Sequence, residues 1–323
     1  MRRTLAAITV LVLAMTLAAG CEAAVEPPIV NDVDRPPPAG TVTIGSKFDT
    51  EGPILGYIMV VLLEDAGFEV IDRTRTGATD VTRRALLTGE IDAYPEYTAN
   101  ALTVFYADED IDPVILQDAR ATYEAAAVLD SENEGIVWLE PAPANNTWAI
   151  AVPRSFAEDN AIFTLEDFAM YVNDGGDIRV AGSQEFFDRP DAMPAFEAAY
   201  GFELTEDQRL ALATGDTAVT ARAAAEGTDD VNAGMVYGTD GTIAALDLYV
   251  LEDPRGVQPI YQPAPTFRAE VIEAFPQIPD ILDPAFVMLD LETLQELNAK
   301  VALEGQDARV VAEEWLRDVG LVD

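Results

Sequence analysis

From Thr41 onward, short apolar runs alternate with segments of helical periodicity, and this alternation limits the fold more than any other feature of the sequence. The run Thr41–Gly45 (TVTIG) predicts the first strand, and an amphipathic stretch at 54–66 predicts a helix that Gly67 ends. Further strands are predicted at 69–71, 91–94, 148–152, 179–181 and 235–237. Strands that alternate with helices indicate βαβ units, so we expect an α/β fold with mainly parallel sheets.

Helical periodicity occupies intervals between these strands and continues to the end of the chain. The predicted helices lie at 79–88, 165–172, 192–200, 206–212, 217–226, 291–303 and 308–319. Two successive α/β units predict two lobes with a cleft between them. Because ligands of open α/β sheets bind outside the carboxyl ends of the strands, we expect a binding site in this cleft.

The first 20 residues have the features of a secretory signal peptide. Two arginines precede an apolar stretch, and small residues lead to Cys21. This ending resembles the lipobox of a bacterial lipoprotein, which implies that Cys21 is acylated and that the protein is held outside the inner membrane by lipid. The alternative is an ordinary signal followed by a chance cysteine. Residues 21–40, rich in proline and acidic residues, predict an extended tether.

The composition excludes several classes of function. Cys21 is the single cysteine and histidine is absent, which excludes disulfides, a cysteine nucleophile, the usual histidine base and most zinc and copper sites. The formal net charge of −39 repels nucleic acid. We therefore expect no nucleic-acid partner, no metal site and no cofactor. Lysine occurs only at Lys47 and Lys300, which draws attention to the lysine near the start of the domain.

Four segments in a fixed order carry a family resemblance. They are IGSKFDTE (44–51) with ILG (54–56), ALLTGEIDAYPEYT (85–98), NNTWAI (145–150), and YGTDG (237–241) followed by LED (251–253) and PIYQPAP (259–265). Together they resemble the glycine betaine/choline substrate-binding proteins of osmoprotectant ABC transporters, over essentially all of 41–323. The resemblance implies a two-lobed periplasmic-binding-protein fold of type II, with two hinge crossings. Lobe 1 would comprise 41–146 and 253–323, and lobe 2 would comprise 147–252.

A trimethylammonium group has no N–H to donate, so a protein recognises it with the faces of aromatic rings, each contributing about 0.5–2 kcal/mol when desolvated. The resemblance implies that such a cage is formed by Tyr97, Trp148, Tyr237 and Tyr261. Trp148 stands where the family commonly has tyrosine, and keeps the aromatic face without the hydroxyl. The alternative is that each ring is a half-buried core aromatic.

A betaine also carries a carboxylate, for which the resemblance implies Lys47, Arg189 and Asn100. Asn100 departs from the family pattern, because Tyr97-Thr98-Ala99-Asn100 stands where Tyr-Thr-Gly-Thr is common. The alternatives are a solvated surface lysine at 47 and a surface ion pair of Arg189 with Asp188 or Asp191. Asn145 and Asn146, at the first crossing, would hold the hinge or reach the ligand.

These features predict an extracytoplasmic solute-binding lipoprotein, not an enzyme. We expect a monomer that captures glycine betaine and delivers it to an ABC permease. Two cations in a small cavity would favour betaine over choline. Alternatives of the same fold bind choline, carnitine or a sulfonium, or sense such compounds at the envelope. A hydrolase using Glu90, Asp92 and Glu96 is a further alternative, although no oxyanion device or metal motif accompanies these acids.

Overall fold

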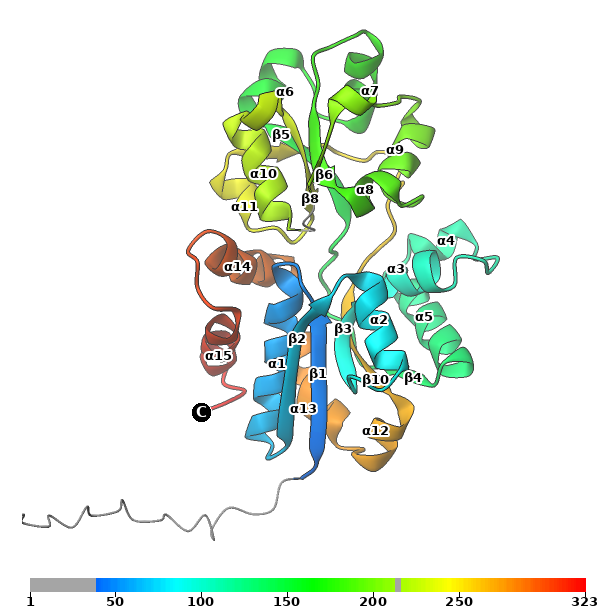
Figure 1. Cartoon of the computed structure of the whole chain (residues 1–323), viewed down its shortest axis with the longest axis vertical. Coiled ribbons are helices and arrows are strands. Elements are labelled where there is room, and N and C mark those ends of the chain that lie inside the picture. Colours follow the sequence, from blue (N-terminus) through cyan, green and yellow to red (C-terminus); the bar gives the residue numbers. More distant parts are fainter. Residues whose placement is uncertain (1–38, 213–215) are drawn as a thin grey trace, which may run out of the picture. The chain divides into compact units, whose positions relative to one another are not determined.

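The computed structural model describes residues 39–212 and 216–323 (Figure 1). The predicted signal peptide, Cys21 and nearly all of the predicted tether lie outside the described residues. None of the helices in the described ranges is both long enough and apolar enough to cross a membrane.

The first sheet has the strand order β2-β1-β3-β10-β4. Three neighbouring strands run parallel, whereas β10 pairs antiparallel with both β3 and β4. The five strands are β1 (Thr41–Lys47), β2 (Glu69–Gly77), β3 (Ala93–Tyr97), β4 (Ile136–Trp138) and β10 (Pro263–Arg268).

The second sheet has the order β7-β6-β8-β5-β9 and repeats this arrangement. Here β6 is parallel to both β7 and β8, whereas β5 is antiparallel to both β8 and β9. The strands are β5 (Trp148–Pro153), β6 (Val180–Ser183), β7 (Arg209–Leu212), β8 (Ala233–Tyr237) and β9 (Leu248–Val250).

The chain passes from the first sheet to the second between β4 and β5, and returns between β9 and β10. These passages agree with the predicted two-crossing α/β fold, but the prediction of mainly parallel sheets is wrong for half of the strand pairings. The reason is geometric. A strand that follows a crossing starts at the hinge, where the neighbouring βα strands end, so it must run in the opposite direction.

Helix α1 (Glu51–Asp65) forms the centre of the part of the molecule that contains the first sheet. Its sequence is apolar on nearly all sides, which is typical of a helix covered all round, and Ile54, Leu55 and Ile58 have no exposed surface. It packs on β1 and β2 and contacts three helices from the C-terminal part of the chain. These are α13 (Ile278–Phe286), α14 (Leu291–Ala302) and α15 (Ala308–Asp318).

The other helices of this part flank the same sheet. They are α2 (Thr79–Leu87), α3 (Thr98–Asn100) with a π-helical turn at Ala101–Phe105, α4 (Pro113–Leu116), α5 (Ala119–Asn133) and α12 (Ala269–Ala274). A buried ion pair between Arg83 of α2 and Asp130 of α5 joins two of them.

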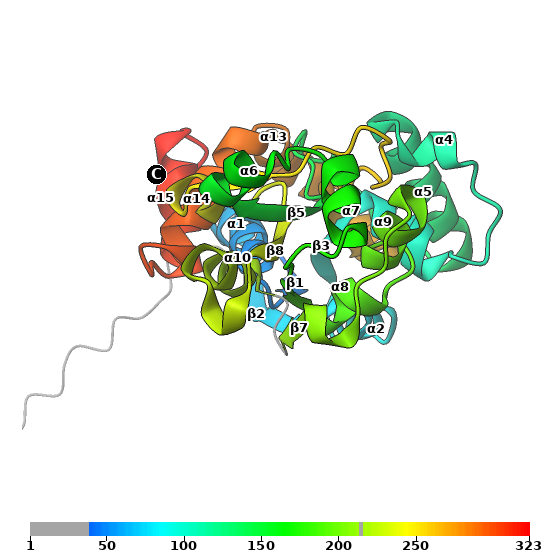
Figure 2. The ribbon, with the colours of Figure 1, turned by 90° about the horizontal axis from the view of Figure 1, so that it is seen from above.

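In the part of the molecule that contains the second sheet, α10 (Thr217–Glu226) lies on one side of β6 and β8. Helices α8 (Gln184–Asp188) and α9 (Met193–Tyr200) lie on the other side (Figures 1 and 2). The remaining helices there are α6 (Arg154–Asn160), α7 (Leu165–Asn173) and α11 (Thr242–Ala245).

The predicted helix at 206–212 is wrong. Residues Glu206–Gln208 form one short 3₁₀ turn, and the next four residues form β7 at the edge of the second sheet. The side chains of Thr205 and Gln208 cap the turn reciprocally, which is a helix-start signal in the sequence. Parallel pairing of 209–212 with β6 overrides this local preference.

Candidate functional site

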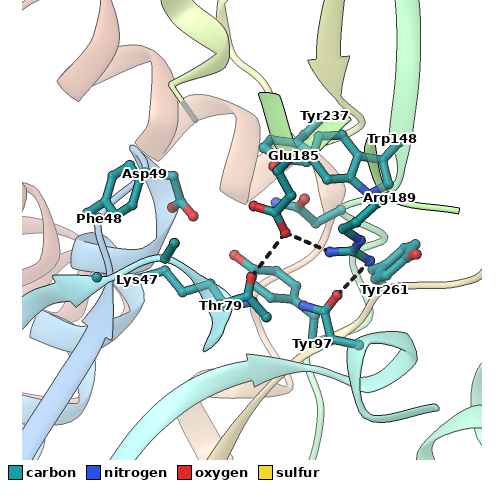
Figure 3. Close-up of a pocket in the computed structure, with 14 residues that line it drawn as sticks. Lys47, Phe48, Asp49, Thr79, Tyr97, Trp148, Glu185, Arg189, Tyr237 and Tyr261 are labelled. Atoms are coloured by element: carbon teal, nitrogen blue, oxygen red, sulfur yellow. Dashed lines mark hydrogen bonds and ion pairs between the residues drawn. The ribbon is translucent and has the colours of Figure 1, made fainter. Parts of the chain in front are cut away.

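A pocket lies where strands of both sheets meet the two crossings. All seven residues predicted to bind the ligand line it, together with Asn146 and six residues that the prediction missed (Figure 3). The lining residues are Lys47, Phe48, Asp49, Gly77, Ala78, Thr79, Tyr97, Asn100, Asn146, Trp148, Glu185, Arg189, Tyr237 and Tyr261.

Strand register brings the four predicted cage rings to this pocket. Trp148, the first residue of β5, pairs directly with Tyr237, the last residue of β8. Their ring centroids are 4.7 Å apart with the planes inclined at 46°. Tyr97 ends β3 opposite Pro263, and Tyr261 lies two residues earlier on the second crossing. The mixed pairing of the sheets therefore creates the aromatic cluster.

Two of the tyrosines are fixed by hydrogen bonds from their hydroxyls. Tyr97 donates to Glu51 Oε1 (2.8 Å), and Tyr261 donates to Asp191 Oδ2 (2.9 Å). Burial, reinforced by the adjacent carboxylates, raises the pKa of both phenols far above the usual value, so both are neutral. Both hydroxyls are engaged by carboxylates, and both residues contribute to the lining of the pocket.

Lys47 is a buried residue, which contradicts the alternative of a solvated surface lysine. Its Nζ donates to Glu96 Oε1 at 2.6 Å and lies 4.8 Å from the centroid of the Tyr97 ring. Glu96 also accepts from Asn100 Nδ2 (2.9 Å) and from the Tyr94 hydroxyl (2.7 Å). Burial favours a raised pKa for Glu96, but Lys47 and the hydrogen bonds outweigh it and lower the pKa. The lysine charge is therefore balanced within the protein.

The positive charge of Arg189 is also balanced by carboxylates of the protein. It donates to both oxygens of Asp191 (2.9 and 2.6 Å), and its Nη1 donates to Glu185 Oε1 (2.9 Å). The pairing with Asp191, which was the alternative to ligand binding, is thus present, but it is largely buried and not at the surface. Asp188 accepts from Gln184 instead. Nη2 of Arg189 also donates to Asn100 Oδ1 (3.1 Å). Since the amide of Asn100 donates to Glu96, this one side chain joins the two ion-pair systems.

Two carboxylates in the pocket lining, Asp49 and Glu185, were missed by the sequence analysis. Burial of Asp49 raises its pKa to about 6, although Lys47 and a hydrogen bond from the Gly52 amide act in the opposite direction. The pocket therefore presents two acids as well as two cations. The expected discrimination against choline by two unbalanced cations loses its basis.

Asn145 and Asn146 both connect the two crossings. Asn145 Oδ1 accepts from the amide of Tyr261 (2.8 Å), and the Asn146 amide donates to the Tyr261 carbonyl (2.9 Å). The side chain of Asn146 donates to Glu51 Oε1 and to Thr239 Oγ1, both at 2.8 Å. Both asparagines thus link the two crossings by hydrogen bonds, and Asn146 also lines the pocket.

Asp240 fixes the end of β8 beside the pocket. Its carboxylate accepts from the Tyr237 amide (2.8 Å) and from Thr217 Oγ1 (2.7 Å). Burial raises its pKa to about 7, in spite of these two hydrogen bonds. Asp240 thus holds the backbone of Tyr237 in place by a hydrogen bond.

A family model for the substrate-binding domain of ABC-type glycine betaine transport systems matches residues 40–318. The chain belongs to this family. It is 50% identical over 282 residues to the glycine betaine-binding protein YehZ of Escherichia coli K12, covering 87% of this chain and 92% of that protein. A glycine-betaine-binding protein of Pseudomonas aeruginosa is 34% identical over 294 residues, covering 88% of this chain and 90% of that protein.

A solved structure has the same fold. Apo YehZ from E. coli aligns with a TM-score of 0.66 at 49% identity, over 87% of this chain and 99% of that one. The fold is therefore that of a type II periplasmic binding protein, and the protein is the substrate-binding component of an ABC transport system. Membership of a transport family agrees with a binding role rather than a catalytic one.

The raised pKa of Asp240 predicts a pH-dependent stability. An aspartate whose pKa is about 7 when folded and about 3.9 when unfolded stabilises the fold below pH 4, and this contribution is lost as the pH rises toward 7. Asp240→Asn should flatten the decline in the free energy of unfolding between pH 4 and pH 7, by on the order of 1 kcal/mol per pH unit. Urea unfolding at pH 4, 5, 6 and 7 measures it.

The matched control is Asp159→Asn, which removes an exposed acid from α6. It should keep the parent slope. Equal slopes for the parent and Asp240→Asn would contradict the raised pKa.

Proposed function

We propose that this protein captures glycine betaine outside the cytoplasm and delivers it to an ABC permease. The observation that carries the proposal is the convergence of four aromatic residues on one pocket at the two crossings, in a chain of this family. Both relatives described above are named for glycine betaine binding, which supports the same ligand here.

The aromatic residues suit the trimethylammonium group. Tyr97, Trp148 and Tyr261 are nearly inaccessible to bulk solvent, so a cation among them is largely desolvated. Under these conditions each ring face contributes about 0.5–2 kcal/mol. We place Tyr237 in the same cage, because its ring packs beside that of Trp148.

Arg189, Lys47 and Asn100 would hold the carboxylate. Arg189 and Lys47 would supply the N–H donors for this carboxylate. The ammonium of Lys47 has three N–H groups, and one of them donates to Glu96. Because Arg189 belongs to the segment after the first crossing and Lys47 ends β1, one carboxylate could contact both lobes. We propose that residues 41–146 and 253–323 form lobe 1 and that residues 147–252 form lobe 2. The two lobes would close on the ligand by movement about the two crossings.

For the rest of the chain we propose a removable signal at 1–20, a lipid on Cys21 and a tether at 21–40. The lipid would hold a monomeric binding domain at the outer face of the membrane, within reach of the permease. Choline, carnitine or a sulfonium compound are alternative ligands for the same rings. A sensory role at the envelope would use the same pocket.

The cage predicts how affinity responds to aromatic substitutions. Trp148→Ala or Tyr237→Ala removes one ring face and should weaken glycine betaine binding by about 1–2 kcal/mol, or roughly 5–30-fold in Kd. Tyr237→Phe keeps the face and should cost less. Isothermal titration calorimetry measures these values, with Phe163→Ala, outside the pocket, as the control. Unchanged affinity in alanine variants of all four cage residues would overturn the cage.

Membrane attachment should depend on Cys21. Cys21→Ser has no thiol to acylate, so the protein should appear in the soluble fraction or remain an uncleaved precursor. Cell fractionation with palmitate labelling tests this, and Glu22→Gln, which leaves the cysteine in place, is the control. A processed, lipid-labelled Cys21→Ser protein would contradict the anchor.

A further inference from the structure

Glu185 lies between the two sides of the pocket. Its Oε1 accepts from Arg189 Nη1 at 2.9 Å and lies 3.5 Å from Thr79 Oγ1, at the start of α2 (Figure 3). It therefore sits beside the guanidinium proposed to hold the ligand carboxylate. The proposed function does not use this acid.

We propose that Glu185 is an internal stand-in for the ligand carboxylate and that it sets the selectivity between zwitterionic and purely cationic quaternary amines. This inference rests on the proposed function and identifies a further specificity-determining residue of that site. In the empty pocket Glu185 supplies Arg189 with a second negative charge, in addition to that of Asp191. A betaine must displace it, whereas choline leaves the Glu185–Arg189 pair intact.

The two acid partners of Arg189 differ in how firmly they are held. Asp191 binds Arg189 through both oxygens, accepts from the buried Tyr261 hydroxyl, and has a side chain that is only 15% exposed. Glu185 makes a single hydrogen bond to Arg189, and its side chain is 36% exposed. Glu185 is thus the partner that can rotate into solvent, while Asp191 remains bound.

Charge balance gives the two ligands opposite requirements. A betaine brings its own carboxylate, so Glu185 competes with it for Arg189 and lowers its affinity. Choline brings a positive charge and no carboxylate, so the negative charge that Glu185 adds to that of Asp191 attracts it. Bulk charge does not decide this, because interactions with distant surface acids are screened by salt beyond about 10 Å. A single side chain therefore acts on the two affinities in opposite directions.

The test compares Glu185→Gln with the parent by isothermal titration calorimetry, using glycine betaine and choline as probes. The full chain is used, as purified from the cells that export it. The substitution keeps the size of the side chain and removes its charge. We expect glycine betaine to bind about five- to tenfold more tightly and choline to bind about five- to tenfold more weakly. Asp188→Asn removes an exposed acid from the same helix and should change both affinities less than twofold.

Glu185→Ala is a second variant with the same expected directions, and circular dichroism confirms that each variant is folded. Equal changes for both ligands, or no change, would overturn the role of Glu185 while glycine betaine binding by the parent upholds the proposed function. A parent that binds neither probe would overturn the proposed function itself, and this inference with it.

Discussion

The buried carboxylate of Glu51 connects the parts on which the site depends. Glu51 is the first residue of α1, where the helix dipole favours a negative charge. It accepts hydrogen bonds from the Tyr97 hydroxyl, the Asn146 side chain and Asn298 of α14, each at 2.8 Å. One group therefore orients an aromatic ring of the pocket, the first crossing and a helix from the C-terminal part of the chain. Removal of any donor would leave a buried carboxylate short of a partner.

The antiparallel pairings of the two mixed sheets determine which residues meet at the pocket. Because β5 and β10 start at the hinge, their first residues lie opposite the last residues of β8 and β3. Trp148 therefore pairs with Tyr237, although the two residues are 89 positions apart in the sequence. The aromatic cluster is thus a consequence of strand direction, and the charged groups are arranged around it.

Much of the architecture could be predicted from local sequence, and the failures have physical causes. The alternation of strands and helices predicted the α/β fold, and the family resemblance predicted seven residues that share one pocket. The strand at 209–212 was missed because its pairing with β6 outweighs a local helix signal. The ion-pair partners of Lys47 and Arg189 were not all foreseen. Glu96 lies 49 positions from Lys47, and only tertiary structure brings them together.

The central claim is that aromatic faces recognise a permanent positive charge rather than a shape. Calorimetric titration with glycine betaine and with 3,3-dimethylbutanoate tests it most directly. The second compound has the same shape and carboxylate, but a carbon replaces the charged nitrogen. Several ring faces worth about 0.5–2 kcal/mol each predict that it binds at least about tenfold more weakly than glycine betaine. Equal or tighter binding of the uncharged analogue would contradict the account.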